Sequence, residues 1–464
     1  MSSLSSSLGI AVRALLAEQG AIETTSNNIA NVNTPGYARQ RPDLVESPPA
    51  VYGNMVLGTG VQLDQVTSLR DSILELRLHQ ETQQQGKLDA FLGSAQQIQT
   101  LFNDAAGSGL QGPLTAFFNS LLQLSTSPSD INLRQGVLTA AGNLANAFNS
   151  TAANAITLQH NVDRSVTQSV NEINDLTGKI SAINGQVSTM QSAGQNPGAL
   201  VDQRDQLIRQ LAGLVDLSVI DAGHGSLTLT TSGGSALVVG NQNFQLTTQA
   251  DTVTGLQHVF SLGKDLTSSI NGGALAGQLQ TRDQEIPSVL SSLDMLAASL
   301  ANSFNAQHQA GFDLNGAEGG NFFVPPLAGG VGAAASLKVA ITDPSKIAAS
   351  GPGSSGSGSA GDNANANALH ALQGQAIVNG QSPLDFYSGM VFRLGNDLAA
   401  AQSQQQTQTL VLQQLGNMRG AVSGVSLDEE AANLMRFQRA FEAAARVATV
   451  VDTLTLTAIN LGQD

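Results

Sequence analysis

The sequence predicts a mainly α-helical protein of several domains with one inserted β region. Three observations support this fold class. Apolar residues recur every three or four positions at both ends of the chain and again between residues 173 and 190. Between residues 216 and 282 the pattern changes to the alternation typical of strands. The 464 residues include 48 glycines, no tryptophan and only 4% aromatic residues, which favours an elongated shape with many small aliphatic contacts over one dense aromatic core.

The first expected element is an amphipathic helix between residues 4 and 30. Its apolar positions lie along one face: Leu4, Leu8, Ala11, Leu15, Ile22 and Ile29. Pro35 disfavours helix at Thr34, and Pro-Gly suits the centre of a type II turn, so the helix should end near Val32. Asn27 and Asn31 lie one turn apart, and their amides either bond between subunits or are exposed and cap the helix locally.

A long helical bundle is expected in the middle of the chain. One seam has strict spacing by threes and fours: Ile173, Leu176, Ile180, Ile183, Val187 and Met190. A helical hairpin partner for this seam is expected in one of three segments, residues 88–102, 131–149 or 286–304.

Two segments interrupt the helical pattern. Alternating residues and Gly-containing turns between 216 and 282 predict a β insertion. Residues 325–362 are rich in Gly, Ser, Ala and Pro, which indicates a loose β region or a flexible linker. The helical pattern resumes near residue 363.

The last element is a second amphipathic helix. Ser426 and Glu429 form a capping box at its start. Isolated amphipathic helices are marginal in water, so both ends of the chain should pack against each other, against other copies or against the chain's own body. The polar face of this helix lacks the richness in Lys and Arg that anionic lipid selects, which argues against a membrane-surface helix. Its apolar stripe comprises Leu427, Ala431, Leu434, Phe437, Phe441, Ala444, Ala448, Val451, Leu454, Ala458 and Leu461.

Composition excludes several partners. The formal charge of −15 and the lack of any Lys/Arg cluster argue against nucleic acid. The absence of cysteine removes disulfides and thiolate metal sites. No apolar run is long enough to span a membrane, and Arg13 interrupts residues 8–17, the one stretch similar to a signal-peptide core.

No motif predicts an enzyme, a metal site or a cofactor site. The six histidines are far apart and are expected to be solvated or partly packed. Residues 351–356 fit GxGxxG but lie in low-complexity sequence, so a linker is favoured. Asp313 and Asn315 suggest a calcium loop, yet a turn is preferred because no further ligand follows. Asp202, Arg204, Asp205 and Arg209 are interpreted as exposed ion pairs of one helix.

Four segments carry a resemblance to a known family: SNNIANVNTPGYARQ (26–40), LVDQRDQLIRQLAGLVDLSV (200–219), GFDLNGAEGGNFF (311–323) and SGVSLDEEAANLMRFQRAFEAAARV (423–447). Together they resemble the bacterial flagellar axial proteins, and within them the hook-associated proteins of the hook–filament junction. The resemblance implies a coiled-coil inner domain (1–60 and 424–464), a helical bundle (61–215, 283–324 and 363–423), an outward β insertion (216–282) and the loose region 325–362.

The resemblance also implies a structural role without chemistry. The protein would be exported through the flagellar type III apparatus without a cleaved signal, held at its C-terminal region by an export chaperone. Outside the cell it would form a ring on the hook protein and support the second hook–filament junction protein and the flagellin filament. Two alternatives stay open: another axial protein of the hook or distal rod, or a carbohydrate-binding or hydrolytic module in the β insertion, although its acids Asp216, Asp221, Asp251 and Asp265 are well separated.

An assembly interface is therefore expected on the two terminal helices. Its expected residues are Leu8, Leu15, Ile22, Asn27, Asn28, Ile29, Asn31, Leu427, Leu434, Phe437, Phe441, Val451 and Leu454.

Overall fold

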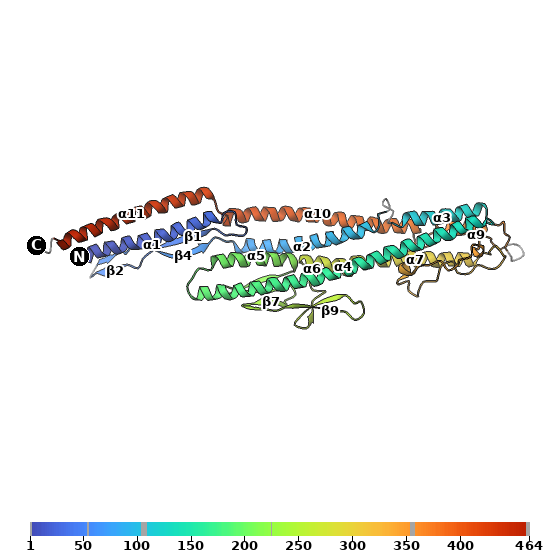
Figure 1. Cartoon of the computed structure of the whole chain (residues 1–464), viewed down its shortest axis with the longest axis horizontal. Helices are drawn as coiled ribbons and strands as arrows, with labels where there is room; N and C mark the ends of the chain where they lie inside the picture. The colour runs from blue at the N-terminus through green and yellow to red at the C-terminus, as the bar shows by residue number, and fades with distance from the viewer. Residues whose placement is uncertain (1, 53–54, 104–108, 224, 353–357, 461–464) are drawn as a thin grey trace.

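The chain forms a long, narrow molecule whose helices run along its length (Figure 1). The computed structural model describes residues 2–52, 55–103, 109–223, 225–352 and 358–460. Both ends of the chain lie at the same tip, and two small sheets lie along one side of the helices. None of the described helices is long and apolar enough to cross a lipid bilayer.

The tip that holds both termini contains two long helices and an extended hairpin. These elements are α1 (Ser2–Ala30), α11 (Leu427–Asn460), β1 (Gln40–Glu46), β4 (Val61–Ser68) and the short strands β2 (Ala50–Tyr52) and β3 (Met55–Leu57). The helix ends close to the expected position, and the turn after it is confirmed, because Tyr37 N–H donates to Thr34 O across Pro35 and Gly36. The hairpin lies along α1 and was not expected from the sequence, although Val61 and Leu63 begin a β alternation.

The middle of the molecule is built on α2 (Ser72–Thr100), which runs antiparallel to α10 (Pro383–Ser423). Beside them lie α4 (Ile131–Ser192) and α5 (Gly198–Leu214). Because α4 is one continuous helix of 62 residues, the segment 131–149 cannot be the hairpin partner of the seam at 173–190. The helix continues from one segment to the other because buried residues follow one another along it without a break, among them Ala152, Leu158 and Val166.

The β insertion consists of two antiparallel sheets. One contains β5 (Ser218–Gly223), β6 (Ser226–Thr230), β7 (Ala236–Val239) and β8 (Gln242–Asn243), and the other β9 (Leu246–Ala250), β10 (Gln257–Ser261) and β11 (Lys264–Asp265). Asparagines of α4 hold both sheets: the Asn174 amide bonds both backbone groups of Leu246, and Asn184 donates to the carbonyl of Leu227.

The segment expected to be β up to residue 282 becomes helical at its end. Here α6 (Gly273–Gln280) and a π-helical turn, η2 (Thr281–Glu285), lead into α7 (Ile286–Gln309). Gly277 lets α6 approach α2 closely, because a Cβ there would lie 2.3 Å from the Lys87 carbonyl oxygen.

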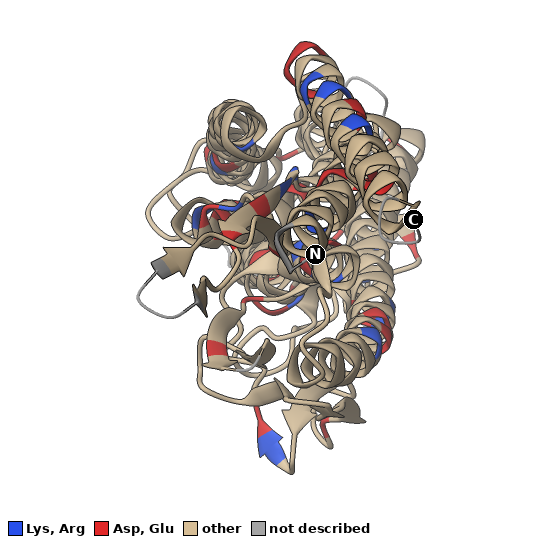
Figure 2. Cartoon of the chain, turned by 90° about the vertical axis from the view of Figure 1, so that its left-hand side faces the viewer, with Lys and Arg blue, Asp and Glu red and all other residues tan. Residues whose placement is uncertain are grey.

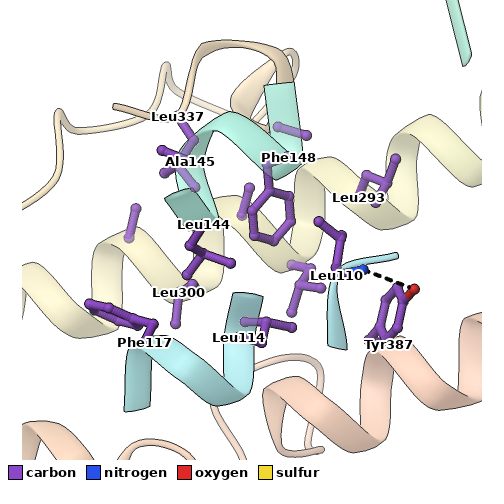
Figure 3. Packing of buried hydrophobic residues seen from close by; sticks show 14 of the residues in the cluster. Leu110, Leu114, Phe117, Leu144, Ala145, Phe148, Leu293, Leu300, Leu337 and Tyr387 are labelled. Atoms are coloured by element: carbon purple, nitrogen blue, oxygen red, sulfur yellow. Dashed lines mark hydrogen bonds between the residues drawn. The ribbon is translucent and has the colours of Figure 1, made fainter. Parts of the chain in front are cut away.

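The end of the molecule far from the termini contains a dense aromatic core, contrary to the expectation of purely small aliphatic contacts. The rings of Phe304 and Phe322 are 4.7 Å apart, and those of Phe117 and Phe304 are 5.1 Å apart. Figure 3 shows this core, in which Leu110 N–H donates to Tyr387 Oη at 3.1 Å. The few phenylalanines are thus concentrated where α3 (Gln111–Thr126), α7 and α9 (Ala364–Ala371) meet.

The Gly/Ser-rich segment is partly built into this core. It contains α8 (Ala333–Ser336) and the 3-10 turn η3 (Pro344–Lys346), and Ile347–Ala349 are fully buried. His308 is also buried, contrary to expectation: its Nδ1 donates to Gly320 O, and its Nε2 accepts from Ala348 N. Asp313 anchors a turn through Asn315 N and Ala317 N, as preferred over a calcium loop.

Part of the glycine motif at 351–356, together with His224 and Leu461, lies outside the described residues.

Candidate assembly site

The two terminal helices bury a narrow inner face against each other and the hairpin. Ala17 and Ala21 of α1 are buried, as are Phe437 and Val451 of α11. Gly20 lies directly against Leu63 of β4, since a Cβ at Gly20 would be 2.6 Å from the Leu63 side chain. Small residues on α1 therefore allow a helix and a hairpin to approach it closely.

The outer side of this pair leaves apolar side chains in solvent. On α1, Leu8, Val12 and Leu16 recur every four residues, with exposed fractions of 36, 45 and 64%. On α11, Val447, Val450 and Leu454 are 50, 58 and 51% exposed. We call these six residues the outer stripe.

Charge is absent from most of the same tip. The charged residues of α11 lie mainly between Asp428 and Arg446, and Asp452 is the one charged residue of the described part beyond Arg446 (Figure 2). A solvated helix end would carry charges there, so the composition of the tip suits burial by another surface.

The structure divides the thirteen expected interface residues into three groups. Exposed residues are Leu8, Asn27, Leu427 and Leu454, half-buried residues are Leu15, Ile22, Ile29, Asn31, Leu434 and Phe441, and buried residues are Asn28, Phe437 and Val451. The amides of Asn27 and Asn31 bond locally, because Asn31 Nδ2 donates to Asn27 O and Oδ1, both at 3.0 Å.

A second feature, which we call the polar junction, joins the tip to the bundle. It consists of Asn28, Tyr37, Arg39, Gln40, Glu429 and Glu430. The Asn28 side chain, 1% exposed, makes four hydrogen bonds within the chain. Its Nδ2 donates to Gln40 O and Glu430 Oε2 at 2.7 and 3.0 Å, and its Oδ1 accepts from Gln40 N and Tyr37 Oη at 2.9 and 2.8 Å.

Arg39 completes the polar junction by holding the start of α11. Its guanidinium lies 2.7 Å from Glu429 Oε2 and 2.7 Å from Glu430 Oε1, and its backbone N–H donates to Ser423 O. The acids after Ser426 therefore do more than cap the helix: the capping contact from Glu429 N to Ser426 Oγ is long, at 3.5 Å, while both glutamates pair with the N-terminal segment.

Charged side chains beneath the polar junction, half-buried except for the buried Asp202, tie it to α2, α5 and α10. We call Arg70, Glu75, Asp202, Arg209 and Arg419 the basal ion cluster. The Glu75 carboxylate accepts from Arg419 Nε at 2.6 Å and from Arg209 Nη1 at 3.0 Å. Arg419 also donates to Gly36 O. Arg70 reaches Asp202 at 2.6 Å.

The interpretation of residues 202–209 as exposed pairs within one helix is therefore wrong. Asp202 and Arg204 are buried, and they bond to other elements: Asp202 to Arg70, and Arg204 to the Asn184 side chain. The spacing alone could not reveal this, because intrahelical and long-range pairs use the same residue types.

Electrostatics in this region follow from burial. Removal from water, with the charges of Asp202 and Glu430 nearby, raises the pKa of Tyr37 to about 12, so its hydroxyl stays protonated and donates to Asn28. Burial alone would raise the pKa of Glu75, but the hydrogen bond from Arg419 and the charge of Arg209 hold it below its ordinary value. Burial lowers the pKa of His79 to about 4.

The contacts at this end of the molecule are apolar packing, hydrogen bonds and ion pairs. Among the described residues, no three His, Asp or Glu side chains converge to hold a metal ion. What the site offers is an apolar tip, a rigid polar connection to a long bundle, and both chain ends at one place.

Comparisons with known proteins match this arrangement along the whole chain. Residues 8–37 match the family described as Flagella basal body rod protein, and residues 418–461 match Flagellar basal body rod FlgEFG protein C-terminal. Residues 95–323 match the Flagellar hook-associated protein FlgK helical domain. These matches at both ends and in the middle of the chain define its class, a structural protein of the flagellar axis.

Similarity to individual relatives shows which family within this class the chain belongs to. The chain is 32% identical to Flagellar hook-associated protein 1 of Bacillus subtilis, with 99% of each chain covered, and 27% identical to the Escherichia coli protein of that name, covering 99% of this chain and 100% of the relative. The chain belongs to the flagellar hook-associated protein 1 family.

A solved structure supports the fold. The flagellar hook junction protein of Burkholderia pseudomallei superposes with a TM-score of 0.68 at 19% identity, covering 75% of this chain and 100% of the other.

Proposed function

We propose that this chain is the structural adaptor at the hook–filament junction, which assembles on the distal hook and supports the second junction protein and then the flagellin filament. The observation that carries the proposal is the outer stripe, which remains in solvent at the tip where both terminal helices meet. Membership of the hook-associated protein 1 family supports the place of assembly.

Assembly would be driven by burial of the outer stripe. Complete burial of a large apolar side chain contributes roughly 1.5–3 kcal/mol, and these six residues are 36–64% exposed, so together they supply roughly half of that amount per residue against the ordering cost. In this proposal α1 and α11 form the coiled-coil inner domain (1–60 and 424–464), which lines the tube. The bundle (61–215, 283–324 and 363–423) forms the next layer together with the buried part of the segment 325–362, and the β insertion (216–282), apart from its helical end, points outward.

The expected interface residues then take two roles. The exposed ones, Leu8, Leu427 and Leu454, would contact neighbouring subunits directly. The buried ones, Asn28, Phe437 and Val451, would act by fixing α1 against α11, because their contacts lie inside the chain.

Partners and route follow from the same proposal. The protein would form a ring on the hook protein and bind an export chaperone through its exposed C-terminal helix. Passage as an unfolded chain through the flagellar type III apparatus, without cleavage of a signal, is compatible with the absence of cysteine. Residues 8–17 also belong to the folded helix α1, where Arg13 donates to Thr59 O at 2.8 Å, which supports their retention.

A single charge in the outer stripe tests this function. Leu16→Asp should leave the circular dichroism and unfolding midpoint unchanged, because Leu16 is 64% exposed, yet it should abolish filaments, because an unpaired carboxylate would be buried on assembly. The matched control is Gln438→Asp, an exposed polar site in the charged first half of α11 and on a different face from the outer stripe, which should retain motility.

The measurements are motility, electron microscopy of filaments and the location of labelled protein on purified hooks. Normal filaments with Leu16→Asp would contradict the proposed burial of the tip. Label along the hook or on the rod, instead of at the distal hook end, would favour another axial protein, the alternative suggested by the rod-protein matches at both termini.

A further inference from the structure

An apolar groove lies on the bundle, far from the terminal tip. Its volume is 870 Å³, and it is formed by α4, α7 and the loop at residues 326–335. Leu327 and Val331 on its rim are 77 and 78% exposed, and Met295 on its wall is 42% exposed. These are large apolar side chains gathered in one place, which in a monomer indicates an interaction surface.

A protruding aromatic residue lies on the other side of the same layer of helices. Phe392 of α10 is 67% exposed, whereas Met390 and Leu394 beside it face the core that contains Leu293 of α7. On α7, the groove residues Asp294 and Met295 lie on the face away from that core, whereas Leu290 lines the groove and also packs partly against the core. The α7–α10 pair thus presents a groove in one direction and Phe392 in the opposite direction.

Charges next to these two features are complementary. Asp294 is the one charged residue of the groove lining, and its carboxylate accepts from Gly332 N and Ala334 N at 2.8 and 2.9 Å. Among the described residues, no Lys, Arg or His side chain forms an ion pair with Asp294. Arg393, adjacent to Phe392, is exposed, and none of the carboxylates that the structure describes pairs with it. A second copy would therefore bring an aromatic ring for the groove and a guanidinium for Asp294.

We propose that neighbouring copies of this chain contact each other laterally, with Phe392 of one copy inserted in the α4–α7 groove of the next and Arg393 paired with Asp294. Because the two surfaces differ, the contact is head-to-tail, and it leaves a free groove at one end and a free Phe392 at the other for further copies. This contact rests on the proposed function, for which it supplies the bundle layer of the ring.

Cysteine pairing tests the contact directly, since the chain has no cysteine of its own. Full-length protein with Phe392→Cys and Met295→Cys is oxidised both on purified flagella and as a concentrated solution. A ladder of disulfide-linked dimers, trimers and larger species is expected, because each copy carries one half of two different contacts. The control pair, Leu410→Cys with Met295→Cys, should give no ladder, although Leu410 is 65% exposed on the same helix. Absence of the Phe392 ladder in both samples would overturn the proposal.

A second variant tests the same contact without introduced cysteines. Phe392→Asp should weaken self-association in sedimentation equilibrium by about tenfold or more, with the thermal midpoint preserved, whereas Leu410→Asp should not change it. Equal behaviour of the two variants would contradict the contact. Location of the unmodified chain at the distal hook decides the proposed function separately: correct location without a ladder removes the lateral contact alone, and a ladder without correct location removes the junction role alone.

Discussion

At the scale of single residues, Asn28 shows how local sequence can mislead. A polar residue in a helix-ending segment is usually exposed or caps the helix, and from its sequence position Asn28 is expected to contact a neighbouring subunit. In the structure all four of its hydrogen bonds are satisfied inside the chain, to a backbone twelve residues away and to Glu430 at the other end of the sequence. The residue could be singled out from the sequence, but its partner, 402 positions away, could not.

His79 gives a pH dependence at the same scale. The folded state lowers the pKa of its imidazole from 6.5 to about 4, chiefly through burial, with Glu75 opposing and Arg209 assisting the shift. As the pH falls from 6.5 towards 4, the unfolded chain binds a proton that the folded chain does not, so this residue decreases the free energy of unfolding by roughly 3 kcal/mol. Above pH 6.5 it has no effect.

The test is urea unfolding of the wild type and of His79→Gln at pH 7 and at pH 4. The variant removes the titrating group, so its loss of stability between the two pH values should be smaller than that of the wild type. Parallel losses in the two proteins would show that His79 is protonated in the folded state.

At the scale of elements, the turn after α1 depends on one glycine. Gly36 has a φ of +86°, and a Cβ there would lie 2.9 Å from the Arg209 guanidinium of the basal ion cluster. Gly36→Ala should therefore destabilise the chain through backbone strain and through displacement of Arg209 from Glu75, by about 2 kcal/mol or more.

Gly194→Ala is the matched comparison. Gly194 has a φ of +72° but nothing within 4 Å of its Cβ position, so only backbone strain of about 1 kcal/mol is expected. The difference between the two variants in chemical unfolding measures the steric contribution at the turn. Equal losses would mean that the Arg209 contact adds nothing.

The elements differ in how well the sequence predicts them. The terminal helices, the turn at Pro35 and the start of the β insertion follow from periodicity and turn chemistry, which act over a few residues. The hairpin at residues 40–68 and the burial of residues 202–209 do not, because both depend on surfaces supplied by distant segments. The continuity of α4 was missed for a related reason: its middle section is lined by alanines that give a weak local signal.

At the scale of the whole molecule, the two ends of the chain differ in how they are held. The far end is closed by a phenylalanine core, whereas the terminal tip buries few apolar residues and exposes the outer stripe. We expect limited proteolysis of a dilute monomer to remove residues 1 to 50 and the last 40 first, because few buried apolar side chains oppose local opening there.

Mass spectrometry of the early fragments measures this, and the same digestion of assembled flagella should leave both ends intact. A monomer whose ends resist cleavage as long as the aromatic core would contradict the idea that assembly orders the tip.

The meeting of both termini at one tip has a practical consequence for labelling. A reporter fused to either end would occupy the surface that we propose to lie in the tube wall, so terminal tags should interfere with assembly whatever their chemistry. The turn between β9 and β10 contains Val253, which is 90% exposed, and β9 lies away from the tip formed by α1 and α11 (Figure 1), so this turn should accept added residues. An epitope placed there would report the position of each subunit while leaving the tip free.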